Sequence, residues 1–288
     1  MNSNRQPNVT TMENTIRIEL LNHPKCASDF LRALKQLVDR QINTITITFS
    51  DTITKHPVYP NACLPICGLI EHFSSNGVKF KICLPTDQFF SNIGFTSPFP
   101  STCDSLNSIQ NPFGKIFRYD EHSQVSELTQ KYLDSISRQC VCAEGVLNGL
   151  SWCINEVMDN VLTHSSASCG YVMAQFHSQP KHLAFCVYDS GDGIYTTLSK
   201  SHHRPGNEID AISLALQEGV GDGKGQGNGL FGLYQVVKQN GGRLTLTSGA
   251  SSIMFGNNIQ KFEHIPLISS KHRSTTVDFQ LDLEKRSI

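Results

Sequence analysis

The chain has 288 residues, of which 39% are hydrophobic, so it is long enough for two domains with their own cores. Lysine plus arginine (24) nearly balances aspartate plus glutamate (25), which gives no sign of a general electrostatic attraction to nucleic acid or anionic lipid. The polar first dozen residues lack a signal-peptide core, and no apolar run is long enough to span a bilayer. The 10 cysteines form no CxxC pair and fit a reducing compartment. We therefore expect a cytoplasmic protein with no membrane partner, and a nucleic-acid partner has little support.

The first part of the chain alternates strands with helices. Side chains of alternating polarity predict three strands, and apolar residues at helical spacing predict two helices between them. These elements are the strands 15–20, 44–49 and 78–84 and the helices 27–41 and 62–73. Such alternation is typical of a small α/β domain whose sheet has parallel neighbours. We assign residues 13–98 to this domain and expect residues 1–12 to be a disordered tail.

The second domain follows a stretch rich in serine, proline, asparagine and threonine, residues 99–114, which predicts a linker. We assign residues 115–288 to the second domain. Its predicted strands are 115–119, a hairpin formed by 169–177 and 182–188, and a last strand at 277–283. Its predicted helices are 125–137, a helix from 141 onward, 209–217, and a helix from 230 onward.

The helix that carries Glu156 and Asn160 is the most informative segment of this domain. The two residues are four apart, so their side chains project from one face of the helix. The opposite face is an apolar stripe formed by Leu150, Ile154, Val157, Met158 and Val161. An acid and an amide on the open face of a half-buried helix predict a bound ligand.

The sequence DSGDG begins at Asp189, directly after the apolar strand LAFCVY. Its glycines, Gly191 and Gly193, allow the backbone to approach a flat ligand. The Asp189 carboxylate can accept a hydrogen bond from an exocyclic amine such as that of adenine. Taken alone, the same sequence is also compatible with a simple tight turn.

A second glycine-rich segment, GQGNGLFG at residues 225–232, runs into a helix with apolar periodicity. Free N–H groups and the positive end of the helix dipole at such a start hold phosphates. A Rossmann motif does not fit because no strand leads directly into the glycines, and a P-loop does not fit because no GKS or GKT occurs.

The three motifs, ExxxN on a helix, DxGxG after a strand and GxGxGLxGL opening a helix, resemble in this order the GHKL ATPases, namely gyrase, heat-shock chaperones, histidine kinases and MutL. The resemblance covers residues 115–282 and is closest to the anti-sigma-factor kinases. It implies a site for ATP and Mg²⁺, with Asn160 as the metal ligand and Glu156 as the catalytic base. The implied nucleotide-binding residues are Asn160, Asp189, Gly191, Gly193, Lys224, Gly225, Gly227, Asn228, Gly229, Leu230, Gly232, Thr275 and Thr276.

The second glycine motif departs from the family. Relatives commonly read GRGLGL where this chain reads GQGNGL, so Gln226 replaces an arginine and Asn228 replaces a leucine. A charge that would meet phosphate is lost at that point. Lys224 or Arg204 would have to replace it.

The segment between the two glycine motifs corresponds to the ATP lid of the family, and its glycines predict that it orders on nucleotide binding. Within it, we expect the pair His202 and His203 to be solvated rather than to touch phosphate. His164 follows the ExxxN motif by four positions, and we expect it to cap or support the site rather than to catalyse.

The N-terminal domain resembles STAS-like domains of bacterial signalling, in its pattern of elements more than in any motif. The serine that is phosphorylated in such domains is missing at residues 60–63, which read PNAC, unless Ser50 or Thr52 takes that role. The expected fold class is therefore a two-layer α/β sandwich of the GHKL type preceded by a small α/β STAS-like domain.

The resemblance leaves three functions open. The first is a nucleotide-dependent regulatory switch with slow hydrolysis, acting on a protein partner in bacterial signalling or defence. The second is a serine/threonine protein kinase of the anti-sigma-factor type, and the third is a non-catalytic ATP-binding interaction module. From the resemblance to the family we also expect a homodimer.

Overall fold

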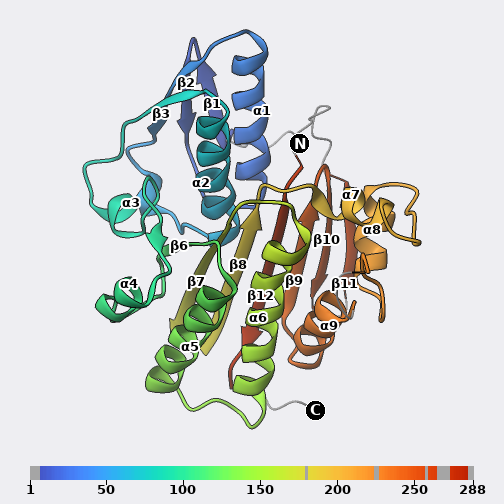
Figure 1. Cartoon of the computed structure of the whole chain (residues 1–288). Helices are drawn as coiled ribbons and strands as arrows, with labels where there is room; N and C mark the ends of the chain where they lie inside the picture. The colour runs from blue at the N-terminus through green and yellow to red at the C-terminus, as the bar shows by residue number, and fades with distance from the viewer. Residues whose placement is uncertain (1–6, 179–180, 224–226, 257–258, 265–272, 285–288) are drawn as a thin grey trace, which may run out of the picture. The chain divides into compact units, whose positions relative to one another are not determined.

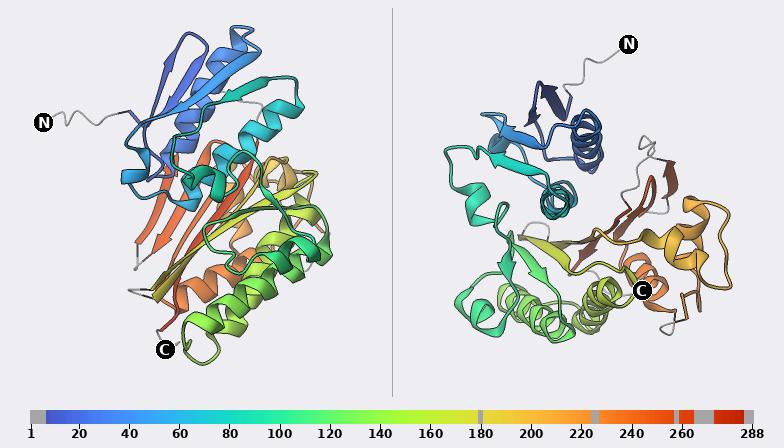
Figure 2. Two further views of the ribbon diagram at one scale, coloured as in Figure 1. Left: turned by 90° about the vertical axis from the view of Figure 1, so that its left-hand side faces the viewer. Right: turned by 45° about the horizontal axis from the view of Figure 1, so that its top comes forward.

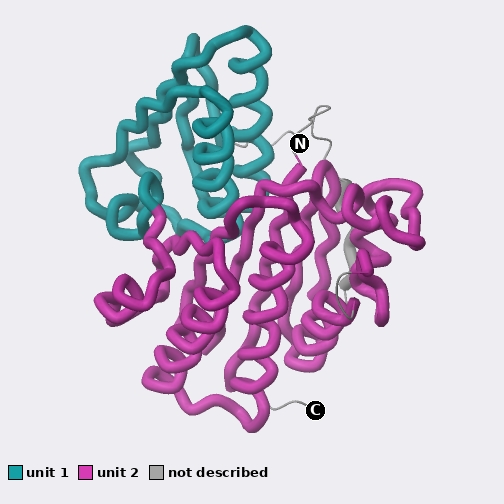
Figure 3. The backbone as a smooth tube through the Cα atoms, in the orientation of Figure 1, with its two compact units in different colours: residues 1–97 teal, residues 98–288 magenta. Residues whose placement is uncertain are grey.

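The computed structural model describes residues 7–178, 181–223, 227–256, 259–264 and 273–284 (Figure 1). The chain divides into two compact units, Met1–Ser97 and Pro98–Ile288 (Figure 3). Among the described residues, no helix is both long and apolar enough to cross a membrane.

Unit 1 contains a four-stranded sheet in the order β1-β2-β3-β4. The first pair is an antiparallel hairpin, and the other neighbours are parallel. Its strands are β1 (Val9–Met12), β2 (Thr15–Ile18), β3 (Thr44–Phe49) and β4 (Lys79–Ile82), and its helical segments are α1 (Lys25–Asp39), η1 (Ile53–Lys55), α2 (Pro60–Ser75) and α3 (Phe89–Asn92). The alternation predicted over this unit is present, and β-branched side chains such as Ile16, Ile45 and Ile47 are fully buried in its core.

Residues 9–12, which we expected to belong to a disordered tail, instead form β1. They pair with β2 across a turn in which Glu13 has a φ of 53°, the left-handed conformation that a tight hairpin requires. The sequence VTTM shows little alternation in polarity, so backbone pairing rather than side-chain burial defines this strand.

Unit 2 is a two-layer α/β sandwich, as predicted. Its eight-stranded sheet has the order β11-β10-β9-β12-β8-β7-β6-β5 and is antiparallel except for the pair β5 and β6. The strands are β5 (Phe99–Pro100), β6 (Ile116–Tyr119), β7 (Gly170–Ser178), β8 (Lys181–Asp189), β9 (Arg243–Ser248), β10 (Ser251–Gly256), β11 (Ile259–His264) and β12 (Thr275–Asp282). The helices are α4 (Cys103–Ser108), α5 (His122–Gln139), α6 (Val146–His164), α7 (Gly193–Ser199), α8 (Glu208–Ala215) and α9 (Gly229–Gln239).

Helices α5, α6 and α9 lie side by side on one face of this sheet (Figures 1 and 2). The apolar stripe predicted on α6 packs into the core with alternate residues of the central strands, such as Phe185 and Phe279. Because burying this stripe sets the rotation of α6, the opposite face that carries Glu156 and Asn160 is directed away from the core.

Residues 99–114, which we predicted as a linker, belong to unit 2. They contain β5 and α4, and they bury Leu106 and Ile109 in the core. Phe99 also packs on Phe117, with ring centroids 6.0 Å apart. A few apolar side chains spaced among turn-forming residues are therefore enough to hold this segment on the sheet.

Candidate functional site

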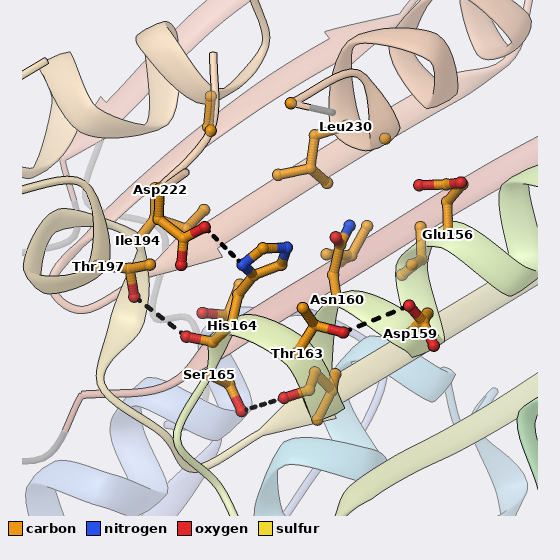
Figure 4. A pocket seen from close by; sticks show the side chains of 18 of the residues that line it. Glu156, Asp159, Asn160, Thr163, His164, Ser165, Ile194, Thr197, Asp222 and Leu230 are labelled. Atoms are coloured by element: carbon orange, nitrogen blue, oxygen red, sulfur yellow. Dashed lines mark hydrogen bonds and ion pairs between the residues drawn. The ribbon is translucent and has the colours of Figure 1, made fainter. Parts of the chain in front are cut away.

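A cavity of about 540 Å³ opens in unit 2 between α6, the end of β8, the segment from α7 to Asp222, and the start of α9 (Figure 4). Its size is that of a small-molecule site. It is lined by Trp152, Glu156, Val157, Asp159, Asn160, Val161, Thr163, His164, Ser165, Val187, Asp189, Gly193, Ile194, Thr197, Leu198, Ala215, Val220, Gly221, Asp222, Gly227, Asn228, Gly229, Leu230, Thr275 and Val277.

Most of the residues selected from the sequence meet at this cavity. Those that line it are Glu156, Asn160, Asp189, Gly193, Gly227, Asn228, Gly229, Leu230 and Thr275. Three others, Gly191, Gly232 and Thr276, do not line it. Lys224 and Gly225 lie outside the described residues.

Glu156 and Asn160 face the start of α9. A Cβ atom placed on Gly229 would lie 2.6 Å from Oε2 of Glu156 and 3.2 Å from Nδ2 of Asn160. The glycine therefore leaves room for these two side chains beside the start of α9. Figure 4 shows Asn160 and His164 pointing into the cavity from α6.

The carboxyl of Glu156 has a pKa above its usual value, mainly because it is partly buried. The charge of Asp159 raises the pKa further, whereas His164 lowers it. A carboxylate with a raised pKa is a better proton acceptor near neutral pH than an exposed one.

Asp189 forms the opposite end of the site. It is the last residue of β8, is only 4% exposed, and lies beside Thr275 of β12. Burial raises its pKa to about 7, although hydrogen bonds from Gly191 and Thr275 oppose this shift. The Gly191 N–H donates to Oδ1 over 2.8 Å. A buried carboxylate held in this way presents an oriented acceptor to a ligand.

Gly191 and Gly232 each make room for a packing contact with α6 or its end. A Cβ on Gly191 would lie 1.9 Å from the carbonyl oxygen of Ser165, so this glycine lets the end of α6 reach the DSGDG turn. A Cβ on Gly232 would lie 2.1 Å from the ring of Trp152, which packs on α9 at that point.

Thr276 points away from the cavity because side chains alternate along a strand. Its neighbours Thr275 and Val277 both line the site, and Thr276 itself lies in register with Tyr188 and Thr247. Of the two threonines selected from the sequence, only Thr275 therefore reaches the cavity.

Sequence reasoning missed several lining residues. Asp159 and Thr163 follow Glu156 by three and seven positions, so helical periodicity alone could have found them. The Thr163 hydroxyl donates to Asp159 over 3.3 Å, and His122 of α5 contacts the other carboxylate oxygen. Asp222 gave no such signal, because only folding brings it to His164.

The described lining contains four carboxylates, those of Glu156, Asp159, Asp189 and Asp222, and neither lysine nor arginine. An anionic ligand here would need a divalent cation to offset this charge. The side-chain oxygen of Asn160 is a neutral hard ligand that fits Mg²⁺ carrying phosphate and water.

The α/β sandwich of unit 2 thus brings this helix, strand end and helix start together around one cavity. Residues 145–285 match the family of histidine kinase-, DNA gyrase B- and HSP90-like ATPases. The matched range begins just before α6 and extends past β12. Unit 2 therefore contains an ATP-binding module of the GHKL type. A search of curated proteins found no match.

Proposed function

We propose that this protein binds ATP with Mg²⁺ in unit 2, hydrolyses it slowly, and uses the nucleotide state to regulate a protein partner in bacterial signalling or defence. The observation that carries this proposal is the arrangement around the cavity, in which Glu156 and Asn160 meet the start of α9 at one end and Asp189 lies beside Thr275 at the other.

The adenine end is formed by Asp189, whose carboxylate accepts a hydrogen bond from the exocyclic amine. Thr275 lies in register with it and supports the base through water. At the phosphate end, the first N–H groups of α9, from Gly229 onward, offer donors and the positive end of the helix dipole.

Asn160 would hold Mg²⁺ through its side-chain oxygen, and the ion supplies positive charge to the phosphates when it is bound. Glu156 accepts the proton of the attacking water as the water oxygen bonds to the γ-phosphorus and the bond to the ADP oxygen breaks. Its raised pKa supports this role because the resulting carboxylic acid is not strongly disfavoured.

Phosphate release by the wild type and by Glu156→Ala and Glu156→Gln tests the proposal. We expect both variants to lose roughly 10² to 10⁴ in rate while they still bind ATP. Binding is followed by the fluorescence of Trp152, the only tryptophan of the chain, which lines the cavity. Equal nonzero rates in the wild type and both variants would contradict the role of Glu156. Tight binding without turnover in the wild type, under any partner condition, would select a non-catalytic module.

A protein kinase of the anti-sigma-factor type is the second candidate. Trp152, one helical turn before Glu156, is 38% exposed and could contact an acceptor protein beside the base. Glu156 would then take the proton of a serine or threonine hydroxyl in place of water. Labelled ATP mixed with cell lysate distinguishes the two activities, since a labelled protein without matching free phosphate indicates transfer.

Unit 1 is proposed to be a STAS-like docking domain for the partner. Its hairpin followed by parallel strands with intervening helices supports this assignment. Pull-down with and without ATP tests it, and removal of bound proteins by ATP is the expected result for a switch. The elution volume on size exclusion tests the expected homodimer.

A further inference from the structure

Asn228, one of the two residues that depart from the family motif, has an unusual partner in this chain. It is the N-cap residue of α9, a position where an asparagine ordinarily accepts a hydrogen bond from the first helical N–H groups. Here its Oδ1 accepts instead from the N–H of Gly219, over 3.0 Å. The side chain therefore connects the start of α9 to the distal end of the lid.

The backbones of the two glycine-containing segments are in contact at the same place. Gly227 has a φ of +70°, and a Cβ there would lie 2.9 Å from the carbonyl carbon of Val220 and 3.0 Å from the nitrogen of Gly221. Only glycine permits this approach, so the chain at 219–221 lies directly against the chain at 227.

A second attachment lies on the other side of the segment. Nδ1 of His164, at the end of α6, is 2.9 Å from Oδ1 of Asp222, whose side chain is only 7% exposed (Figure 4). The Thr197 hydroxyl donates to the carbonyl oxygen of His164, which ties α7 to the same helix end. Val220, Gly221 and Asp222 all line the cavity, so this attached segment forms one of its walls.

Helix α8, near the middle of the lid, is anchored separately. Glu208, at the start of α8, accepts a hydrogen bond from the Ala250 N–H over 2.8 Å and contacts the Ser251 hydroxyl at 3.4 Å. The lid is thus attached to the turn between β9 and β10 through α8, and to α6 and α9 near its C-terminal end. Release of the second attachment would free residues 219–222 without displacing α8.

We propose that Asn228 and His164 are positioning residues that hold the segment 219–222 against the phosphate side of the cavity. This inference rests on the proposed ATP site for its consequence, because entry and release of the triphosphate then require the segment to detach. It assigns to Asn228 a role that the leucine of the family motif cannot fill, since leucine has no acceptor.

Hydrogen exchange of the nucleotide-free protein tests the attachment directly. Asn228→Leu removes the acceptor, and we expect the Gly219 amide to exchange about threefold faster. This is the lower part of the range expected for the loss of one hydrogen bond, and we choose it because Asn228 is exposed. Asn228→Asp keeps an acceptor oxygen and should match the wild type. Wild-type exchange in Asn228→Leu, or fast exchange in Asn228→Asp, would overturn the role of this side chain.

Asp222→Ala and His164→Ala test the second attachment. Each should raise exchange over residues 220–223 about tenfold, as expected for a hydrogen bond to a charged group, and the double variant should raise it by less than the product of the two effects because both remove the contact between His164 and Asp222. Fully additive effects of the two substitutions on exchange would contradict a contact between His164 and Asp222. Exchange of α8 should stay unchanged in all variants.

The consequence for the site is measured by displacing bound nucleotide and following Trp152 fluorescence. Release should be about threefold faster in Asn228→Leu than in the wild type. If the wild type binds no nucleotide, the proposed function fails, and the exchange experiment still decides the attachment. If nucleotide binds and release is equal in all variants, the attachment does not control access and the inference fails.

Discussion

The contact between Gly229 and Glu156 allows the proposed base to be displaced without removing it. In Gly229→Ala, the new Cβ would lie 2.6 Å from Oε2 of Glu156, where ordinary contact begins at 3.4 Å. The carboxylate is the free end of a flexible side chain, so we expect it to move by about 0.8 Å while the fold remains intact. A misplacement of about 1 Å costs on the order of 10²-fold in rate.

Phosphate release measures this effect. We expect a loss of roughly tenfold to 10²-fold in kcat with little change in ATP affinity, because the base acts in the chemical step and not in binding. Gly149→Ala is the matched control, since its Cβ would meet Val236 at an ordinary 3.6 Å. That substitution should leave kcat unchanged and stabilise α6 by about 0.5 to 1 kcal/mol.

A double-mutant cycle decides whether Glu156 transmits the effect. Once Glu156→Ala has removed the carboxylate, adding Gly229→Ala should cost nothing more. Wild-type turnover in a correctly folded Gly229→Ala would refute the reasoning. Additive losses in the double variant would show that the alanine acts through some other group.

Two further predictions concern the DSGDG turn. Because the pKa of Asp189 is raised to about 7, its contribution to the free energy of unfolding is fully present below about pH 4 and is lost as the pH rises through 7. Asp189→Asn should remove a pH-dependent loss of about 3 kcal/mol between about pH 5 and about pH 8, measured by urea unfolding at these two pH values, and a wild-type slope in the variant would contradict this origin. The same variant should bind ATP roughly tenfold to 10²-fold more weakly, because a charge-assisted hydrogen bond is lost. Gly191→Ala places a Cβ 1.9 Å from the backbone oxygen of Ser165, which cannot yield, so we expect a loss of about 3 kcal/mol; a thermal midpoint equal to that of Gly149→Ala would disprove the close packing.

Elements with regular apolar spacing could be predicted from the sequence. The stripe on α6 and the alternation in β3 both reflect burial on one side, which local periodicity encodes directly. No strand is predicted above at the position of β9, although Leu244 and Leu246 alternate with threonines there. Strand β1 and helix α4 carried too little periodicity to be found.

The ExxxN spacing and the DSGDG motif selected Glu156, Asn160 and Asp189, all of which line the cavity. These residues were accessible because helical repeat and strand ends are local properties of the chain. The functions of neighbouring glycines were not accessible in the same way. Gly191 makes room for Ser165, and this depends on a contact with a different element.

By itself, the sequence determined which face of α6 carries the acid and the amide, since burial of an apolar stripe sets the rotation of a helix. Only the tertiary structure decided that Asp222 lies against His164 and that Asn228 accepts from Gly219 rather than capping its own helix. The insertion of β12 between β8 and β9, which brings Thr275 to Asp189, was also decided there. These pairings join segments that are distant along the chain, and no local periodicity specifies which distant partner a side chain will meet.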